Sequence, residues 1–308
     1  MLDIVFIIVG AVLIIKGADI MTDGAAGIAR RLGMSQLVIG LTIVAMGTSA
    51  PELFVSLMSA IKGKADLAVG NVVGSNIVNT LVIVGVTATI APLNVLRRTV
   101  IRDIPVMVAA SFAMLFMGLD GQFSRADCAI LFVGFISFII YTVSHAKTGD
   151  ADEQTNAKKM AIWKAILFVL IGLGCLVGGG QLFVDGASGI ARSLGVSDAI
   201  IGLTIVAIGT SLPELAASIV AARKGQGDMA IGNVIGSNIF NILFVIGLPG
   251  IIAPMHINGV TMVDMTLMVA CPVLFWFFSR TRYKIERWEG WVLTLIYVVY
   301  VVWLITNL

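Results

Sequence analysis

Two acidic residues stand inside apolar stretches of this chain, where an unpaired charge is costly. Glu52 and Glu214 each end the same pattern, Gly-Thr-Ser-x-Pro-Glu, and neither apolar stretch contains a Lys or Arg that could neutralise the carboxylate. Ionisable residues at such depth are rare and usually mark ion pathways. A structural ion pair with a buried protein cation is the alternative, but the sequence offers no partner. We therefore expect bound cations to neutralise Glu52 and Glu214.

The residues just before each glutamate supply hydroxyl groups and free backbone carbonyls. Helical spacing puts four positions of the first copy on one face: Ala45, Thr48, Ser49 and Glu52. Pro51 has no N–H to donate to the carbonyl of Gly47, and a carbonyl freed at membrane depth needs another partner. A proline kink packed by small residues is the alternative, but it does not explain why Thr, Ser and Glu occur in both copies. The second copy offers the equivalent positions Ala207, Thr210, Ser211 and Glu214.

Two further stretches carry amide and hydroxyl side chains. Ser75 and Asn79 are four residues apart and therefore share a helix face, as do Ser237 and Asn241. We interpret these two faces as parts of the ion site. Two other asparagines fit ion ligation and interhelical hydrogen bonding equally well: Asn71 and Asn233.

The candidate ligands are carboxylates, hydroxyls, amide oxygens and backbone carbonyls, with no thiolate or imidazole among them. Such oxygen sets favour hard cations such as Ca²⁺, Na⁺ or Mg²⁺ over zinc, copper or iron. No nucleophile–base pair and no phosphate-binding loop accompanies them. We therefore expect neither an enzyme nor a protein with a resident cofactor.

The elements that must position these residues are membrane-spanning helices. The chain has 308 residues, of which 58% are hydrophobic and only 12% charged, whereas soluble domains carry about 25% charged residues. The net charge of +2 gives no indication of nucleic-acid binding. Apolar stretches of suitable length predict ten helices, near residues 2–20, 37–60, 67–91, 103–119, 126–144, 162–184, 199–222, 229–252, 261–279 and 289–306.

An internal repeat organises these ten helices. Residues 40–53 and 202–215 are identical at 12 of 14 positions, and residues 70–79 and 232–241 at 8 of 10, both at an offset of 162. Because each unit contains an odd number of helices, the second copy enters the membrane from the opposite side, as in many secondary transporters. The predicted fold is thus all-α, with two inverted five-helix repeats at 1–144 and 162–308 and a polar linker at 145–161.

The positive charges predict the orientation in the membrane. Fourteen Lys and Arg residues fall on the linker side and four on the other side, and cytoplasmic loops carry the excess of positive charge. We therefore expect the linker in the cytoplasm and both termini outside.

The two Gly-Thr-Ser-x-Pro-Glu-Leu segments, each followed by a Gly-Asn-x-x-Gly-Ser-Asn segment, resemble the sodium/calcium exchanger branch of the calcium/cation antiporter superfamily. The resemblance covers essentially the whole chain. It implies ten helices in which broken helices two, three, seven and eight enclose the cation sites, while helices one and six act as gates.

The resemblance also assigns ligands. It implies Ca²⁺ at Glu52 and Glu214 with the carbonyls of Thr48 and Thr210. Sodium would use Ala45, Thr48, Ser49 and Ser75 in the first half, and Ala207, Thr210, Ser211 and Ser237 in the second. Asn79 and Asn241 would complete the central layer. Many relatives carry Asp at the position of Asn241, so this chain argues against potassium co-transport.

These inferences predict an antiporter that exchanges Ca²⁺ for Na⁺ across the cytoplasmic membrane by alternating access. A proton-coupled Ca²⁺ antiporter is the alternative, because a glutamate can exchange a proton as readily as a sodium ion. A cation channel belongs to a different class, and the inverted repeat argues against it. The expected partners are the two ions and the lipid bilayer, without an obligate protein partner.

Overall fold

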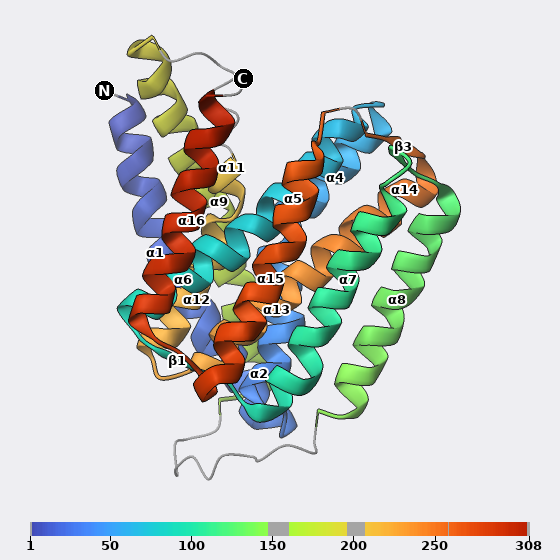
Figure 1. Cartoon of the computed structure of the whole chain (residues 1–308). Coiled ribbons are helices and arrows are strands. Elements are labelled where there is room, and N and C mark those ends of the chain that lie inside the picture. The colour runs from blue at the N-terminus through green and yellow to red at the C-terminus, as the bar shows by residue number, and fades with distance from the viewer. Residues whose placement is uncertain (1, 147–159, 196–206, 258, 307–308) are drawn as a thin grey trace.

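The computed structural model describes residues 2–146, 160–195, 207–257 and 259–306, and within these ranges the chain is almost entirely helical (Figure 1). The first half contains α1 (Leu2–Leu32), α2 (Gln36–Ile39), η1 (Gly40–Val44), α3 (Ala45–Thr48), α4 (Ala50–Ile61), α5 (Ala65–Val78), η2 (Asn79–Ile83), α6 (Val84–Ile90), β1 (Leu93–Asn94), η3 (Thr99–Asp103), α7 (Ile104–Met117), β2 (Gln122–Phe123) and α8 (Arg125–Ser144).

The second half repeats this order as far as it is described, except that no π-helical segment equivalent to η3 precedes α15. It contains α9 (Ile162–Ser193), α11 (Ala207–Thr210), α12 (Leu212–Arg223), α13 (Gly227–Phe240), η5 (Asn241–Ile246), α14 (Gly247–Ile252), β3 (Met255–His256), α15 (Met262–Arg282), β4 (Lys284–Ile285) and α16 (Arg287–Thr306). The segments labelled η are π-helical turns.

The helices are long and apolar enough to cross a membrane. Eight described helices meet this condition, and the bent pair Gln36–Thr48 and Ala50–Ile61 gives a ninth span. The predicted span at 199–222 begins among residues 196–206, outside the described residues. Large apolar side chains such as Ile8, Phe116 and Val299 are more than half exposed on the outer surface. An apolar exterior of this extent indicates contact with lipid, so the prediction of an all-α integral membrane protein is confirmed.

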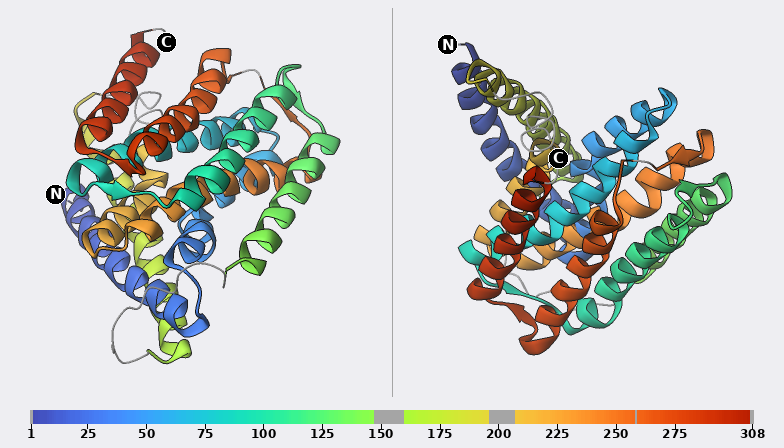
Figure 2. Two further views of the ribbon diagram at one scale, coloured as in Figure 1. Left: turned by 60° about the horizontal axis from the view of Figure 1, so that its bottom comes forward. Right: turned by 45° about the horizontal axis from the view of Figure 1, so that its top comes forward.

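Helices α1 and α9 form a closely packed antiparallel pair on one side of the bundle (Figure 2). Glycines bring the two backbones together: a Cβ atom added at Gly17 would lie 2.8 Å from the carbonyl oxygen of Gly172, and one added at Gly179 would lie 2.9 Å from that of Gly10. Both helices are longer than predicted, ending at Leu32 and Ser193. The buried small residues 24–27 extend the packed face of α1 beyond its apolar stretch.

The expectation of four broken helices is only partly correct. The helix made of α2, η1 and α3 bends by 47° at Ser49, where α4 begins. By contrast, predicted helices three and eight are the continuous helices Ala65–Ile90 and Gly227–Ile252. The prediction that these two helices are broken is therefore wrong. Each of these helices contains a π-helical segment that begins at Asn79 or Asn241. A π-helical turn changes the direction of side chains without breaking the helix.

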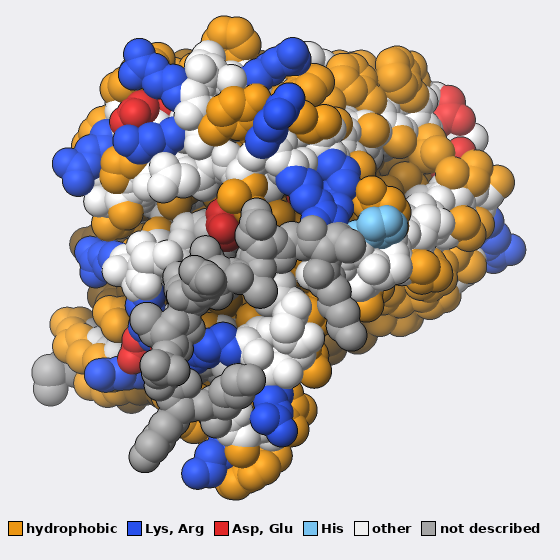
Figure 3. Space-filling model, turned by 90° about the horizontal axis from the view of Figure 1, so that it is seen from below, with side chains coloured by type: hydrophobic (Ala, Val, Ile, Leu, Met, Phe, Trp, Pro, Cys, Tyr) orange, Lys and Arg blue, Asp and Glu red, His pale blue; other side chains and the backbone are white. Residues whose placement is uncertain are grey.

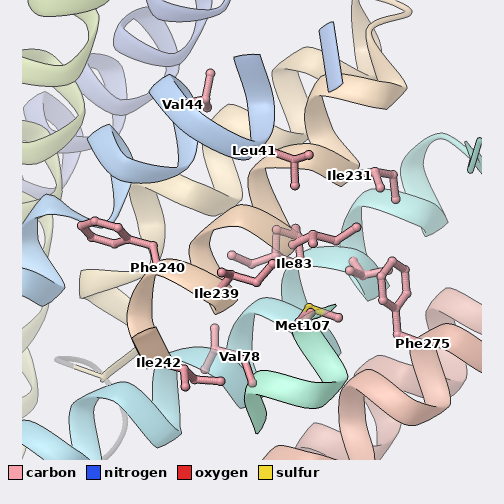
Figure 4. Packing of buried hydrophobic residues seen from close by; sticks show 14 of the residues in the cluster. Leu41, Val44, Val78, Ile83, Met107, Ile231, Ile239, Phe240, Ile242 and Phe275 are labelled. Carbon is pink, nitrogen blue, oxygen red and sulfur yellow. The ribbon is translucent and has the colours of Figure 1, made fainter. Parts of the chain in front are cut away.

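The two continuous helices form the buried centre of the bundle. Around them a single apolar cluster joins side chains from both halves of the chain. Figure 4 shows Leu41 of η1, Ile239 of α13 and Met107 of α7 within this cluster. Gly236 permits the close approach of α13 to η1, since a Cβ atom there would lie 2.5 Å from the carbonyl oxygen of Leu41.

Two short antiparallel sheets connect the halves at opposite ends of the bundle (Figure 1). In the sheet of β1 and β4, Leu93 pairs with Ile285; in the sheet of β2 and β3, Phe123 pairs with Met255. The two pairs are related by the repeat offset of 162, because Met255 is the equivalent of Leu93 and Phe123 is the equivalent of Ile285. The N- and C-terminal ends of the described chain lie at the same end of the molecule (Figure 1).

Candidate cation site

The break between α3 and α4 places Glu52 in the interior. Ser49 leaves the helical conformation (φ −83°, ψ 11°), and Pro51 follows as one of the first residues of α4. Proline is well suited to this position because the first N–H groups of a helix have no partner in the preceding turn. The side chain of Glu52 is 1% exposed. Ser211, Pro213 and Glu214 repeat this arrangement at the start of α12, and Glu214 is also 1% exposed.

Each glutamate is linked to the serine of the other half of the chain. The hydroxyl of Ser49 donates a hydrogen bond to Oε1 of Glu214 at 2.7 Å, and that of Ser211 donates to Oε1 of Glu52 at 3.5 Å. The second oxygen of each carboxylate, Oε2, is buried without a hydrogen-bond partner. The two carboxylates therefore lie in one polar centre between the two helix breaks, each with an oxygen available to a ligand.

Asn71 and Asn233 hold the start of α4 and α12 in place. The side-chain nitrogen of Asn71 donates to the carbonyl oxygen of Glu52 at 3.3 Å and to Oγ of Ser56 at 3.0 Å. Asn233 makes the same two contacts with Glu214 and Ser218, at the same distances. Interhelical hydrogen bonding thus accounts for these two asparagines.

The other predicted asparagines lack such partners. Both side-chain polar atoms of Asn79 and of Asn241 are buried without a hydrogen bond, as is the hydroxyl of Ser237. An unpartnered buried amide costs about 1–3 kcal/mol, and these groups are free of protein partners that would compete with a ligand. The π-helical segment that begins with Asn79 packs against α12, and that of Asn241 packs against α4.

The remaining predicted residues lie on the same elements. Ala45, Thr48 and Ser75 are buried, and the hydroxyl of Thr48 donates to Oδ1 of Asn233 at 3.2 Å. Thr210 is half-buried at the end of α11. Ala207 begins α11, but its side chain lies outside the described residues.

The charge of the site comes from the two glutamates. Among the described residues, no Lys or Arg forms an ion pair with Glu52 or Glu214, and no group of three or more His, Cys, Asp or Glu side chains could hold a metal ion. A cation here would therefore complete its shell with hydroxyl, amide and carbonyl oxygens. Hard cations accept such mixed oxygen shells.

Ser56 and Ser218 are buried polar neighbours of the two glutamates that the sequence did not single out. Each is buried and accepts a hydrogen bond from the asparagine that holds the adjacent glutamate backbone. Each lies four residues after its glutamate, which puts both on the same helix face. That spacing could have identified them.

The end of the molecule that carries β1 and β4 is rich in positive charge. Figure 3 shows this face, on which many Lys and Arg side chains gather. Its basic residues include Arg30 and Arg31 at the end of α1, Arg282 at the end of α15 and Lys284 in β4.

Comparisons with known proteins agree with this geometry. The family model described as "Sodium/calcium exchanger protein" matches residues 2–144 and 164–306. A putative antiporter, CaxA of Alkalimonas amylolytica, is 41% identical over 96% of both chains. The sodium/calcium exchanger MaX1 of Methanosarcina acetivorans is 32% identical over 97% of both chains.

A solved structure of the sodium–calcium exchanger NCX_Mj, soaked with Na⁺ and Sr²⁺, superimposes on this chain with a TM-score of 0.86, at 32% identity over 98% of both chains. Because the family model and full-length relatives agree with the duplicated Gly-Thr-Ser-x-Pro-Glu motif, this chain belongs to the sodium/calcium exchanger family of the calcium/cation antiporters.

Proposed function

We propose that this protein exchanges Ca²⁺ for Na⁺ across the cytoplasmic membrane, with both ions binding at Glu52 and Glu214. The observation that carries the proposal is the pair of buried carboxylates, each with one unpartnered oxygen and each linked to a serine of the other half. Two negative charges balance one Ca²⁺ or two Na⁺. The same centre can therefore bind Ca²⁺ or Na⁺, but it cannot bind one Ca²⁺ and two Na⁺ at the same time.

The proposed ligand assignment is the one that the resemblance to the exchanger family implies. Ca²⁺ binds the two carboxylates with the carbonyls of Thr48 and Thr210. Na⁺ uses Ala45, Thr48, Ser49 and Ser75 on one side, and Ala207, Thr210, Ser211 and Ser237 on the other. Asn79 and Asn241 provide the amide oxygens of the central layer, and their unpartnered atoms support this role.

The chain is built of two inverted five-helix repeats with ten spans, at 1–144 and 162–308. The exchanged pairings of β1 with β4 and of β2 with β3 support a two-fold relation between the halves. The equal contacts of Asn71 and Asn233 support it as well. The excess of basic residues at the linker end supports a cytoplasmic linker, and hence external termini.

Transport proceeds by alternating access, with α1 and α9 moving as one body across the site. Their glycine-mediated contact supports motion as a unit, because backbone-to-backbone packing leaves little room for independent movement. Helix α9 also lies against both helix breaks: Leu173 fills the space beside Gly47, and Val184 the space beside Gly209. A shift of the pair can therefore uncover the site on one side and cover it on the other.

Proton coupling is the second candidate, since the carboxylates of Glu52 and Glu214 lie in a buried setting that also suits a neutral, protonated form. Ca²⁺ uptake into vesicles distinguishes the two. We expect an imposed Na⁺ gradient to drive uptake and an imposed pH gradient at the same clamped voltage to drive none. Uptake driven by the pH gradient alone would replace Na⁺ with H⁺ as the coupling ion.

A further inference from the structure

Lys224 joins the loop after α12 to the side of α1. Its ammonium group lies 2.6 Å from Oδ1 of Asp19 and 2.7 Å from Oδ1 of Asp23, and it donates to the carbonyl oxygen of Asp19 at 2.9 Å. Partial burial by itself would lower the pKa of Lys224, but the hydrogen bonds with the two aspartates outweigh this effect and raise it. Lys224 is thus a charged tie between α1 and α12 at the basic end of the molecule.

The equivalent residues of the other half do not form this tie. Subtracting 162 from Lys224 gives Lys62, in the loop after α4, and adding 162 to Asp19 and Asp23 gives Gln181 and Asp185 on α9. Gln181 donates instead to Oδ1 of Asp185 at 3.0 Å. Within the described residues, Lys62 forms no ion pair with Asp185. The second end therefore keeps the lysine and one of the two carboxylates, and only the Lys224 end is closed in this structure.

Helix packing differs between the two ends in the same way. Helix α1 packs along α12, whereas α9 makes hardly any contact with α4. Val55 of α4 is 38% exposed, while the equivalent Ala217 of α12 is 2% exposed. Figure 2 shows the ends of α1 and α9 near the N-terminus diverging from the bundle. The α1–α9 pair therefore packs against α12 at the Lys224 end and is separated from α4 at the Lys62 end.

We propose that Lys224 and Lys62 are two alternating latches, and that Lys62 binds Asp185 when the α1–α9 pair swings toward α4. This inference rests on the proposed alternating access and adds the residues that hold each end closed. In the state described here Lys224 holds α1 against α12. In the opposite state the Lys224 pairs separate, and Lys62 holds α9 against α4.

The strength of the ties suits a reversible latch. Asp19 and Asp23 are about half exposed, with side-chain exposures of 49% and 50%. Partly exposed ion pairs stabilise a contact only weakly, so a tie of this kind biases the position of the pair without trapping it. Removing Lys224 should change the ratio of the two states by about two- to fivefold.

The distance between two spin labels tests the proposal without measuring transport. One label replaces Ile61 at the end of α4 and the other replaces Leu194 after α9; both side chains are exposed. The three native cysteines are changed to Ala, and the full chain is studied in lipid nanodiscs. The ratio of short to long distances reports how often α9 is seated against α4.

Lys224→Gln should raise this ratio by about two- to fivefold, and Lys62→Gln should lower it. The double variant Asp19→Asn, Asp23→Asn removes the same tie from the α1 side and should reproduce the effect of Lys224→Gln. Lys224→Arg keeps the charge and should leave the ratio unchanged, as should Lys64→Gln in the same loop as Lys62.

Two results would overturn the latch. The first is an unchanged ratio of short to long distances in both Lys224→Gln and the double aspartate variant. The second is a ratio that rises in Lys62→Gln as it does in Lys224→Gln. A shift of the expected signs in a protein that fails to couple Ca²⁺ to Na⁺ would leave the latch intact and overturn only the ion assignment.

Discussion

The hydroxyl of Ser49 donates a 2.7 Å hydrogen bond to the carboxylate of Glu214, a residue 165 positions later in the chain. The corresponding bond from Ser211 to Glu52 is longer, at 3.5 Å, which is the limit of hydrogen-bond geometry. The two halves therefore contribute unequally to the polar centre in this state, although their motifs are nearly identical.

This inequality predicts different effects for the two serines. Hydrogen bonds to a charged group contribute about 1.5–3 kcal/mol, so Ser49→Ala should raise the Na⁺ concentration for half-maximal exchange by about tenfold or more. Ser211→Ala should raise it less. Na⁺-dependent Ca²⁺ flux in vesicles provides the measurement, and Ser137→Ala on the outer face of α8 serves as the control. A larger effect at Ser211 would show that the distances do not govern Na⁺ binding.

The asparagines that hold the glutamate backbones should matter for stability. Asn233→Leu leaves the carbonyl of Glu214 and the hydroxyl of Ser218 without their donor, at a cost of about 1–3 kcal/mol in the free energy of unfolding. Asn71→Leu should cost less, because Asn71 is only half-buried. Thermal unfolding in detergent measures both, with the exposed Asn94→Ala as the control. An Asn233→Leu variant as stable as wild type would contradict the structural role.

The contact between α1 and α9 should tolerate no added side chain at its glycines. A Cβ atom at Gly172 would lie 2.5 Å from the Cβ atom of Met21 and 2.7 Å from the carbonyl oxygen of Gly17. Overpacking of this kind typically costs about 1–3 kcal/mol, so Gly172→Ala should slow exchange and lower the melting temperature. Gly174→Ala, two residues away on the exposed face, is the matched control. Equal behaviour of the two variants would mean that close packing of the pair is not required.

Charge counting predicts that Na⁺/Ca²⁺ exchange depends on voltage. The two glutamates neutralise one Ca²⁺ or two Na⁺, so the Ca²⁺-loaded site is neutral. The symmetry-related hydroxyl and carbonyl sites of the two halves leave room for a third Na⁺, and with three bound the Na⁺-loaded site is positive. Moving one charge through 100 mV is worth about 2.3 kcal/mol, roughly a fiftyfold change in the equilibrium. Ca²⁺/Ca²⁺ self-exchange should therefore be independent of voltage while Na⁺/Ca²⁺ exchange is not. Identical Na⁺/Ca²⁺ exchange at 0 and about −100 mV would mean that the charge count is wrong.

Periodicity and the duplicated motifs were sufficient to predict the helical membrane fold and to select the residues that meet at its centre. Glu52, Glu214, Ser49 and Ser211 form one cluster because helical spacing and the proline break are local properties that a sequence displays directly. The π-helical turns at Asn79 and Asn241, which pack against α12 and α4, were not predicted. No composition rule distinguishes such a turn from ordinary helix.

The non-local contacts were also beyond the sequence. The pairings of Leu93 with Ile285 and of Phe123 with Met255 join two-residue strands that carry no detectable alternation. The difference between Lys224, which is paired, and Lys62, which is not, depends on where the α1–α9 pair rests. The sequence differs here in one respect, since Gln181 stands at the position equivalent to Asp19, but it does not display the resting position of the helix pair, which is a property of one conformational state.

The most direct test of the central claim is calorimetric titration of Ca²⁺ into the purified protein, with and without Na⁺, for wild type, Glu52→Gln and Glu214→Gln. Each substitution keeps the side-chain shape but removes half of the charge that balances the divalent ion, and Glu286→Gln outside the site is the control. We predict that Na⁺ competes with Ca²⁺ in wild type and that each site variant loses at least about 100-fold in Ca²⁺ affinity while remaining folded, as expected when one of two desolvated charges is removed. Unchanged Ca²⁺ binding in both site variants, or Ca²⁺ binding that Na⁺ does not weaken, would contradict the account.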